Sequence, residues 1–307
     1  MRSSARSLVD SPSTVRLASL ALDDVMALTN QLLTSANALA AMTARLRLAE
    51  LGQEGDPAVR AQLDRVADAL ESRDLYDGLS DQERAIVIAF SHSYLRQALD
   101  LVDNPARAPG WSYTDPVLLQ AQGSASAVVA RLMAQAGVGT PDARILDVGT
   151  GVAGLAIALC RTFPASTVVG LDPWEPALAL ARKNVAEAGL ESRITLRDTM
   201  IQDFADPDGF DMAWLPSFFI PDSVLDDAIS RIHGLLRPGG TLVVGTMQGE
   251  KESLHAAVDG LRTVRSGGAV VSPADARTRL ERAGFSDVRE PEVGMDAPLR
   301  LVVGTGP

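Results

Sequence analysis

The residues best suited to chemistry lie in the run 144–154, which reads Arg-Ile-Leu-Asp-Val-Gly-Thr-Gly-Val-Ala-Gly. An apolar segment there leads through Asp147 into closely spaced glycines, and Asp172 follows at the end of the next apolar segment. Glycines let a backbone turn sharply and approach a ligand, and an acid about 20 residues further on is placed to accept hydrogen bonds from ribose hydroxyls. This spacing predicts a site for a cofactor that contains a nucleoside.

The glycine spacing by itself leaves two cofactors open. Residues 149–154 satisfy the dinucleotide pattern G-x-G-x-x-G, so an NAD-dependent oxidoreductase is one interpretation. Asp147 argues against it, because a carboxylate at the end of the strand repels a pyrophosphate at the N-terminus of the following helix. The same carboxylate attracts a cation, and S-adenosylmethionine (SAM) carries an ammonium, a sulfonium and a ribose. The acid therefore favours SAM over NAD.

The segment from Ile145 to Gly154, with Asp172 after it, resembles the first two motifs of class I SAM-dependent methyltransferases. A strand–turn–helix corner without a ligand is the alternative for these residues. The resemblance covers the chain from about Pro141 onward and extends to the small-molecule, natural-product branch of the family. It implies an α/β, Rossmann-like fold with a seven-stranded sheet in the order 3-2-1-4-5-7-6, whose last strand is antiparallel. The family's usual third glycine is Ala153 here.

The resemblance also assigns residues to the cofactor. Asp147 is expected near the amino-acid end of SAM, Gly149 and Gly151 are expected to give backbone access to it, and Asp172 is expected to take the ribose hydroxyls. The remaining contacts expected are Pro173 and Trp174 beside the adenine, Met200 and Ile201 over its face, Leu215 at the end of the fourth strand, and Tyr113 in a segment where such enzymes place a lid. Plain packing is the alternative for Trp174.

In the third turn the family often carries an acid, and the usual alignment puts Met200 at that position. Asp198 supplies the acid if the turn is shifted. After the fourth strand, an apolar wall for a small acceptor is expected from Pro216, Ser217, Phe218 and Phe219, with Gln120 as a further pocket residue. Packing against the helical region is the alternative for this wall. The Asn/Asp-Pro-Pro-Tyr-like element of amino-group methyltransferases is not found there.

A general base matters chiefly when the methyl acceptor is a hydroxyl or a carbon acid, and histidine often serves as that base. The chain has three histidines. His255, in the helix expected after the fifth strand, and His92, in the N-terminal helical region, are the catalytic candidates, whereas His233 is expected on a helix surface. The histidines and the single Cys160 lack the spacing of a metal-binding set, so no metal is expected.

Net charge and composition limit the kinds of molecule and the cellular compartment expected for this protein. The net charge of −11 argues against binding along nucleic-acid phosphates, which needs a basic surface. One cysteine allows no internal disulfide and fits a reducing compartment, so a cytoplasmic protein is expected. Residues 25–44 carry no charge but contain too many polar side chains to span a membrane. Their apolar residues recur at steps of three and four, which predicts a helix whose apolar stripe needs a partner and suggests a homodimer.

The patterning divides the chain in two. Residues 1–137 are helical throughout and are expected to form an N-terminal lid and dimerisation domain, with residues 1–14 as a disordered tail. Residues 138–307 alternate short apolar runs with alanine-rich stretches, as βα units do, and are expected to form the SAM-binding core. Strands are expected at residues 144–148, 167–171, 193–196, 212–215, 241–246, 288–293 and 299–304.

These features predict a SAM-dependent methyltransferase that acts on a small molecule by in-line displacement, in a pocket between the helical domain and the core. O-methylation is placed first because it is common among small-molecule members of the family. C- and N-methylation stay open, as do an NAD-dependent oxidoreductase and a non-catalytic SAM-binding protein.

Overall fold

The computed structural model describes residues 22–246, 253–293 and 299–306, so the expectation for the tail 1–14 lies outside the described residues. The chain divides into two compact units, Met1–Leu101 and Val102–Pro307. No helix in the described part of the chain is long and apolar enough to cross a membrane.

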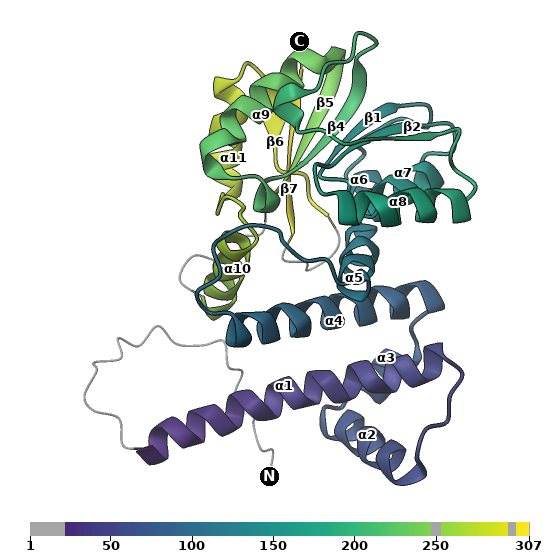
Figure 1. Cartoon of the computed structure of the whole chain (residues 1–307), viewed down its shortest axis with the longest axis vertical. Helices are drawn as coiled ribbons and strands as arrows, with labels where there is room; N and C mark the ends of the chain where they lie inside the picture. The colour runs from purple at the N-terminus through teal and green to yellow at the C-terminus, as the bar shows by residue number, and fades with distance from the viewer. Residues whose placement is uncertain (1–21, 247–252, 294–298, 307) are drawn as a thin grey trace. The chain divides into compact units, whose positions relative to one another are not determined.

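The first unit is helical (Figure 1). Its elements are α1 (Leu22–Glu50), α2 (Pro57–Ala69), α3 (Arg73–Asp77) and α4 (Asp81–Asp103). Asp56 caps α2 by accepting hydrogen bonds from the backbone N–H groups of Ala58 and Val59. Ser80 and Glu83 form a reciprocal capping box at the start of α4. The helix starts thus follow from local sequence signals.

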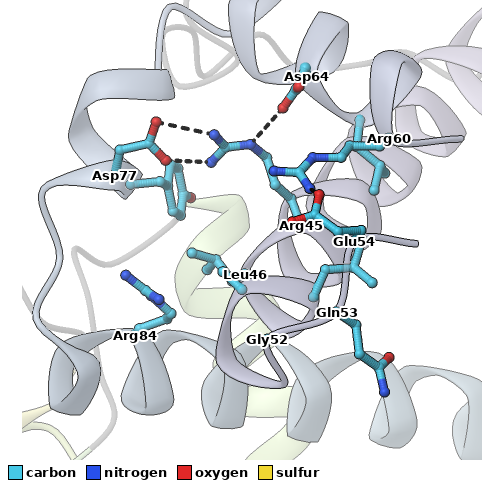
Figure 2. A pocket seen from close by; sticks show the side chains of 13 residues that line it. Arg45, Leu46, Gly52, Gln53, Glu54, Arg60, Asp64, Asp77 and Arg84 are labelled. Carbon is cyan, nitrogen blue, oxygen red and sulfur yellow. Dashed lines mark hydrogen bonds and ion pairs between the residues drawn. The ribbon is translucent and has the colours of Figure 1, made fainter. Parts of the chain in front are cut away.

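A charge network ties three helices of this unit together around a hollow of about 490 Å³ (Figure 2). Arg45 on α1 donates two hydrogen bonds to Asp77 on α3, at 2.7 and 3.1 Å, and one to Asp64 on α2, at 3.0 Å. The guanidinium of Arg45 lowers the pKa of Asp77, chiefly through these hydrogen bonds. Through these hydrogen bonds the network fixes the positions of α1, α2 and α3 relative to one another.

The second unit is an α/β domain built on one seven-stranded sheet. Its strands are β1 (Arg144–Val148), β2 (Thr167–Leu171), β3 (Ile194–Arg197), β4 (Phe210–Pro216), β5 (Leu236–Thr246), β6 (Ser286–Arg289) and β7 (Arg300–Thr305). The sheet order is β3-β2-β1-β4-β5-β7-β6, with β7 antiparallel to β5. The order and the antiparallel last strand predicted from the family resemblance are confirmed.

Helices flank this sheet in two groups (Figure 1). The first group is α5 (Pro116–Ser126), α6 (Val128–Gln135), α7 (Gly154–Thr162) and α8 (Glu175–Glu187); the second includes α9 (Asp222–Leu235) and α11 (Pro273–Arg282), and α10 (Leu254–Arg265) follows β5. The core side chains of the central strands are almost fully buried, as expected for a parallel sheet covered on both faces. Helices α5 and α6, which precede residue 138, pack on α7 and so lie in the second unit.

Candidate active site

A pocket of about 590 Å³ opens where β1, β2, β3 and β4 reach their carboxyl ends. This edge of a parallel α/β sheet is where ligands bind in such folds, because the strand order reverses there. Its walls come from the turn after each strand, from α5 and from the segment before α5. The lining residues are Trp111, Leu119, Gln122, Gly123, Ser126, Val148, Gly149, Thr150, Gly151, Val152, Leu171, Asp172, Pro173, Trp174, Ala177, Thr199, Met200, Ile201, Gln202, Phe219, Ile220, Pro221, Ser223 and Val224.

The glycine-rich turn after β1 forms one wall of this pocket. Gly149 and Gly151 both adopt positive φ, at 71° and 55°, which side chains rarely tolerate. A Cβ placed on Gly151 would meet no atom within 4 Å, so the backbone there faces open space that a ligand can occupy. Ala153 takes a third positive φ, at 64°, and Gly154 begins α7. The turn thus exposes backbone to the pocket, as cofactor binding requires.

Asp172 stands at the end of β2 and lines the pocket. One carboxylate oxygen accepts a hydrogen bond from the backbone N–H of Gly151 at 2.8 Å, and the other accepts from the N–H of Trp174 at 2.8 Å. Burial raises the pKa of Asp172, while these two backbone hydrogen bonds oppose the rise. A carboxylate has about four acceptor positions, so capacity remains for ribose hydroxyls.

Asp147 occupies a different position from Asp172. Its side chain is 1% exposed, does not line the pocket, and accepts a hydrogen bond from the Thr150 hydroxyl at 2.7 Å. Burial raises the pKa of Asp147 to about 7, the Thr150 hydrogen bond lowers it, and the charge of Asp172 raises it. Asp147 therefore supports the glycine-rich turn from beneath, and its contact with the cofactor stays a prediction.

An aromatic group closes another side of the pocket. The Trp111 ring lies edge-on to the rings of Tyr113 and Phe219, with centroids 5.1 and 5.2 Å apart. Trp174 donates from its indole nitrogen to the backbone oxygen of Tyr113 at 2.8 Å. Trp111, Trp174 and Phe219 line the pocket, whereas Tyr113 does not. Tyr113 thus supports the wall, and its predicted cofactor contact is not seen in the pocket lining.

Met200 and Ile201 lie in the turn after β3 and line the pocket, and their contact with the adenine stays a prediction. Met200 is 53% exposed and Ile201 is buried. Thr199 and Gln202 also line the pocket, whereas Asp198 does not. The polar groups at this wall are therefore a hydroxyl and an amide, and the carboxylate considered for a shifted turn lies outside the lining.

Most residues of the expected acceptor wall lie outside the pocket lining. Of the run 216–219, only Phe219 lines the pocket. Ser217 is fully buried and donates to the backbone oxygen of Gly245 at 2.8 Å, because a short 3-10 turn at Ser217–Phe219 directs it inward. Leu215 and Pro216 are buried in β4, and Phe218 packs on Phe219.

Gln120 is also turned away from the pocket lining and bonds to Asn184 on α8. The pocket face of α5 instead carries Leu119, Gln122, Gly123 and Ser126, which sequence reasoning missed. These four follow the spacing i, i+3, i+4, i+7 of one helix face, and that spacing is the signal that separates them from Gln120.

Neither catalytic histidine candidate lines this pocket. His255 on α10 is 60% exposed, and its Nε2 lies 3.1 Å from the buried carboxylate of Asp259. His92 lies on α4 in the first unit and is half-buried. His233 packs edge-on against Phe285, at 4.8 Å between centroids, and is half-buried where a surface position was expected. Within the pocket lining of the described residues, Asp172 is the only charged side chain.

The chain is similar in sequence and in fold to known methyltransferases. Residues 145–240 match the family model described as "Methyltransferase domain". The chain is 38% identical over 102 residues to demethylmenaquinone methyltransferase of Thermus thermophilus, which is 33% of this chain and 46% of that protein. The chain therefore spans less than half the length of this curated relative.

Two solved structures resemble the whole chain in fold. An O-methyltransferase family protein from Burkholderia thailandensis superposes with a TM-score of 0.63 at 17% identity, covering 94% of this chain and 99% of that one. Human N-acetylserotonin methyltransferase in complex with SAM gives a TM-score of 0.66 at 15% identity, covering 92% and 98%. The glycine-rich turn, Asp172 and the open edge of the sheet fit the cofactor of this fold. Residues 145–240 of this chain are therefore a methyltransferase domain, with a pocket whose glycine-rich turn and Asp172 suit S-adenosylmethionine.

Proposed function

We propose that this protein transfers a methyl group from SAM to a small-molecule acceptor. The observation that carries the proposal is the convergence of Gly149, Gly151 and Asp172 on one pocket with a largely apolar wall. The turn offers backbone close to the ligand, and Asp172 offers acceptors for a ribose. The acidic net charge of the chain and the small pocket support a metabolite over a nucleic acid as the acceptor.

When bound, SAM supplies a methyl group made electrophilic by its sulfonium. The residues of the chain bind the cofactor, align it with the acceptor and exclude water from the reacting groups. Asp172 and the glycine-rich turn hold the cofactor, while Trp111 and Phe219 provide apolar surface that desolvates the reacting groups. Alignment of two reactants can supply much of the acceleration of an in-line displacement.

O-methylation is the leading assignment, because it is common in small-molecule members of the family. The name of the structurally similar O-methyltransferase from Burkholderia thailandensis agrees with it. C- and N-methylation stay as alternatives. His255 and His92 are proposed as the candidate bases. Neither lines the pocket, so the structure is equally compatible with an acceptor that ionises without a base from the protein. Among the described residues, no histidine lines the pocket, which leaves a non-catalytic SAM-binding role as the second candidate.

The proposal is tested by incubating the purified protein with SAM and a panel of phenols, enols, amines and carboxylic acids. We expect S-adenosylhomocysteine to accumulate together with one methylated acceptor, detected by mass spectrometry. SAM binding without turnover on any acceptor class would support the non-catalytic role. Binding of NAD without binding of SAM would overturn both.

We also propose that the protein forms a homodimer through its N-terminal helices. We place it in the cytoplasm and in natural-product metabolism. The apolar stripe of α1 is covered only at its C-terminal end, where Met42 and Leu46 are buried. Val25, Leu28 and Leu32 remain 44, 54 and 49% exposed. A contiguous apolar patch of this kind marks an interaction surface. The single buried Cys160 supports a reducing compartment.

Leu28→Glu combined with Leu32→Glu is expected to convert the dimer into a monomer of 32.4 kDa, measured by light scattering after size exclusion. The physical reason is that two carboxylates cannot be buried in an apolar interface without partners. Asn30→Glu with Thr34→Glu adds the same charge on another face of α1 and is expected to leave the mass unchanged. A wild-type protein that is already monomeric, or a dimeric Leu28/Leu32 variant, would contradict the proposed interface.

A further inference from the structure

Two side-chain amides from distant parts of the chain bond to each other beside the cofactor pocket. Gln120 on α5 donates from Nε2 to Oδ1 of Asn184 on α8 at 2.9 Å. Asn184 donates from Nδ2 to Oε1 of Gln120 at 3.0 Å. Both side chains are partly buried, and 64 residues separate them. A reciprocal amide pair of this kind fixes the orientation of both groups, since each donor meets an acceptor.

The pair also reaches the glycine-rich turn. Asn184 donates a second hydrogen bond from Nδ2 to the backbone oxygen of Val152 at 2.8 Å. Val152 follows Gly151 directly, is buried and lines the pocket. The amide pair therefore holds the backbone of the turn at Val152, the residue that follows Gly151, whose backbone faces open space.

The backbone of α5 lies very close to the same turn at Gly123. A Cβ on Gly123 would overlap Cγ2 of Val152, and a Cβ on Gly154 would overlap the backbone oxygen of Gly123. On the pocket side, Asp172 accepts a hydrogen bond from the N–H of Gly151 at 2.8 Å. The turn is thus held on one side by Asp172 and on the other by α5 and α8.

We propose that Gln120 and Asn184 are positioning residues that preorganise the glycine-rich turn for SAM, an inference that rests on the proposed function. Neither residue lines the pocket. They act through Val152 and keep Gly149 and Gly151 in the positive-φ conformation that exposes backbone to the ligand. If the pair is lost, the turn must be ordered when the cofactor binds, and that ordering free energy is subtracted from the binding free energy.

The test is isothermal titration of the purified full chain with SAM and with S-adenosylhomocysteine. Asn184→Leu is expected to weaken both affinities by about tenfold, since it removes the bond to Val152 and leaves buried polar groups without partners. Gln120→Met removes only the support of Asn184 and is expected to weaken them less. Lys183→Leu, at the exposed neighbouring position on α8, is the matched control and is expected to bind as the wild type does.

A double-mutant cycle tests whether the two amides act as one unit, and amide hydrogen exchange separates positioning from general stability. Because the two amides act as one unit, the variant carrying Gln120→Met and Asn184→Leu is expected to bind no more weakly than Asn184→Leu alone. Amide hydrogen exchange at Gly151 and Val152 is expected to rise in each variant while the sheet stays protected. If Asn184→Leu does not fold, Gln120→Met carries the test, because it removes the hydrogen bonds that orient the Asn184 amide toward Val152, and a smaller loss of affinity is still expected.

Folded variants that bind SAM within twofold of the wild type would overturn the positioning role and leave the proposed function intact. A lower melting temperature with unchanged affinity would do the same, because it indicates a purely structural contact. Wild-type protein with no measurable affinity for SAM would overturn the proposed function and the positioning role together.

Discussion

Asp172→Ala is expected to weaken SAM binding by about 1–3 kcal/mol, or about 5- to 150-fold in Kd, the range for charge-assisted hydrogen bonds. The carboxylate lines the pocket and is expected to accept from the ribose hydroxyls. It also accepts backbone hydrogen bonds from Gly151 and Trp174, so its removal loosens both sides of the site. Calorimetric titration measures the change directly.

Two further variants separate these contributions. Asp172→Asn keeps one acceptor oxygen without the charge and is expected to lie between the wild type and Asp172→Ala. Asp198→Ala removes a neighbouring charge that raises the pKa of Asp172 but does not line the pocket, so its affinity is expected to stay close to that of the wild type. Unchanged SAM affinity in Asp172→Ala would remove the residue from the cofactor site.

Asp147→Asn is expected to stabilise the cofactor-free protein at pH 8. Burial raises the pKa of Asp147 from 3.8 to about 7 in the folded state, so folding takes up a proton between these two values. The contribution of this carboxyl group to stability is therefore greatest at acid pH, declines as pH rises from about 4, and reaches its minimum above about 7. A shift of about three pKa units corresponds to about 4 kcal/mol at most.

The measurement is thermal unfolding of both proteins between pH 5 and pH 8. The variant is expected to gain stability over the wild type as the pH rises, and the difference between the two is expected to narrow toward pH 5. Thr150 can still donate its hydrogen bond to the amide oxygen of the variant, so the local contact is retained. A difference in melting temperature that stays constant across this range would show that Asp147 is already ionised in the folded protein.

The same carboxyl group is expected to link cofactor binding to pH. If Asp147 supports the cationic amino-acid end of SAM, binding favours its ionised form and releases a proton near neutral pH. SAM affinity should then fall as the pH drops below about 7, by up to about tenfold per pH unit, and Asp147→Asn should bind more weakly with little pH dependence. Titrations in buffers of different ionisation enthalpy report the released proton.

The sheet was predictable from the sequence because its central strands are buried and bounded by strong turn signals. The observed bounds of β1 and β2 equal the predicted residues 144–148 and 167–171. The edge strand β6, predicted at residues 288–293, lies at Ser286–Arg289. Its residues are mostly exposed and Asp287 has a positive φ of 48°, so apolar alternation carries little information there.

Residues expected at the cofactor line the pocket more often than residues expected at the acceptor, and geometry explains this difference. Gly149, Gly151 and Asp172 lie where turns join strands to helices, and the sequence spacing of such turns determines which edge of the sheet they reach. The directions of Ser217 and Gln120 depend instead on partners remote in sequence, the backbone of Gly245 and the side chain of Asn184. Residue patterns within one segment of the sequence do not identify hydrogen-bond partners that lie far away along the chain.

The match to a methyltransferase domain favours SAM over NAD, the two cofactors that the glycine spacing left open. The dinucleotide pattern fits residues 149–154 as well as the methyltransferase motif does, but the match over residues 145–240 includes the turns that follow the later strands. Within that range Asp147 is buried beneath the turn and bonded to Thr150, and in its ionised form it would favour a cationic ligand and oppose a pyrophosphate.

The measurement that tests the central claim most directly is a parallel calorimetric titration of the full chain with SAM and with NAD. We expect saturable binding of one SAM per chain, with a Kd on the order of micromolar, and no measurable heat from NAD at the same concentrations. Saturable binding of NAD in the absence of SAM binding would contradict the assignment of this pocket to methyl transfer.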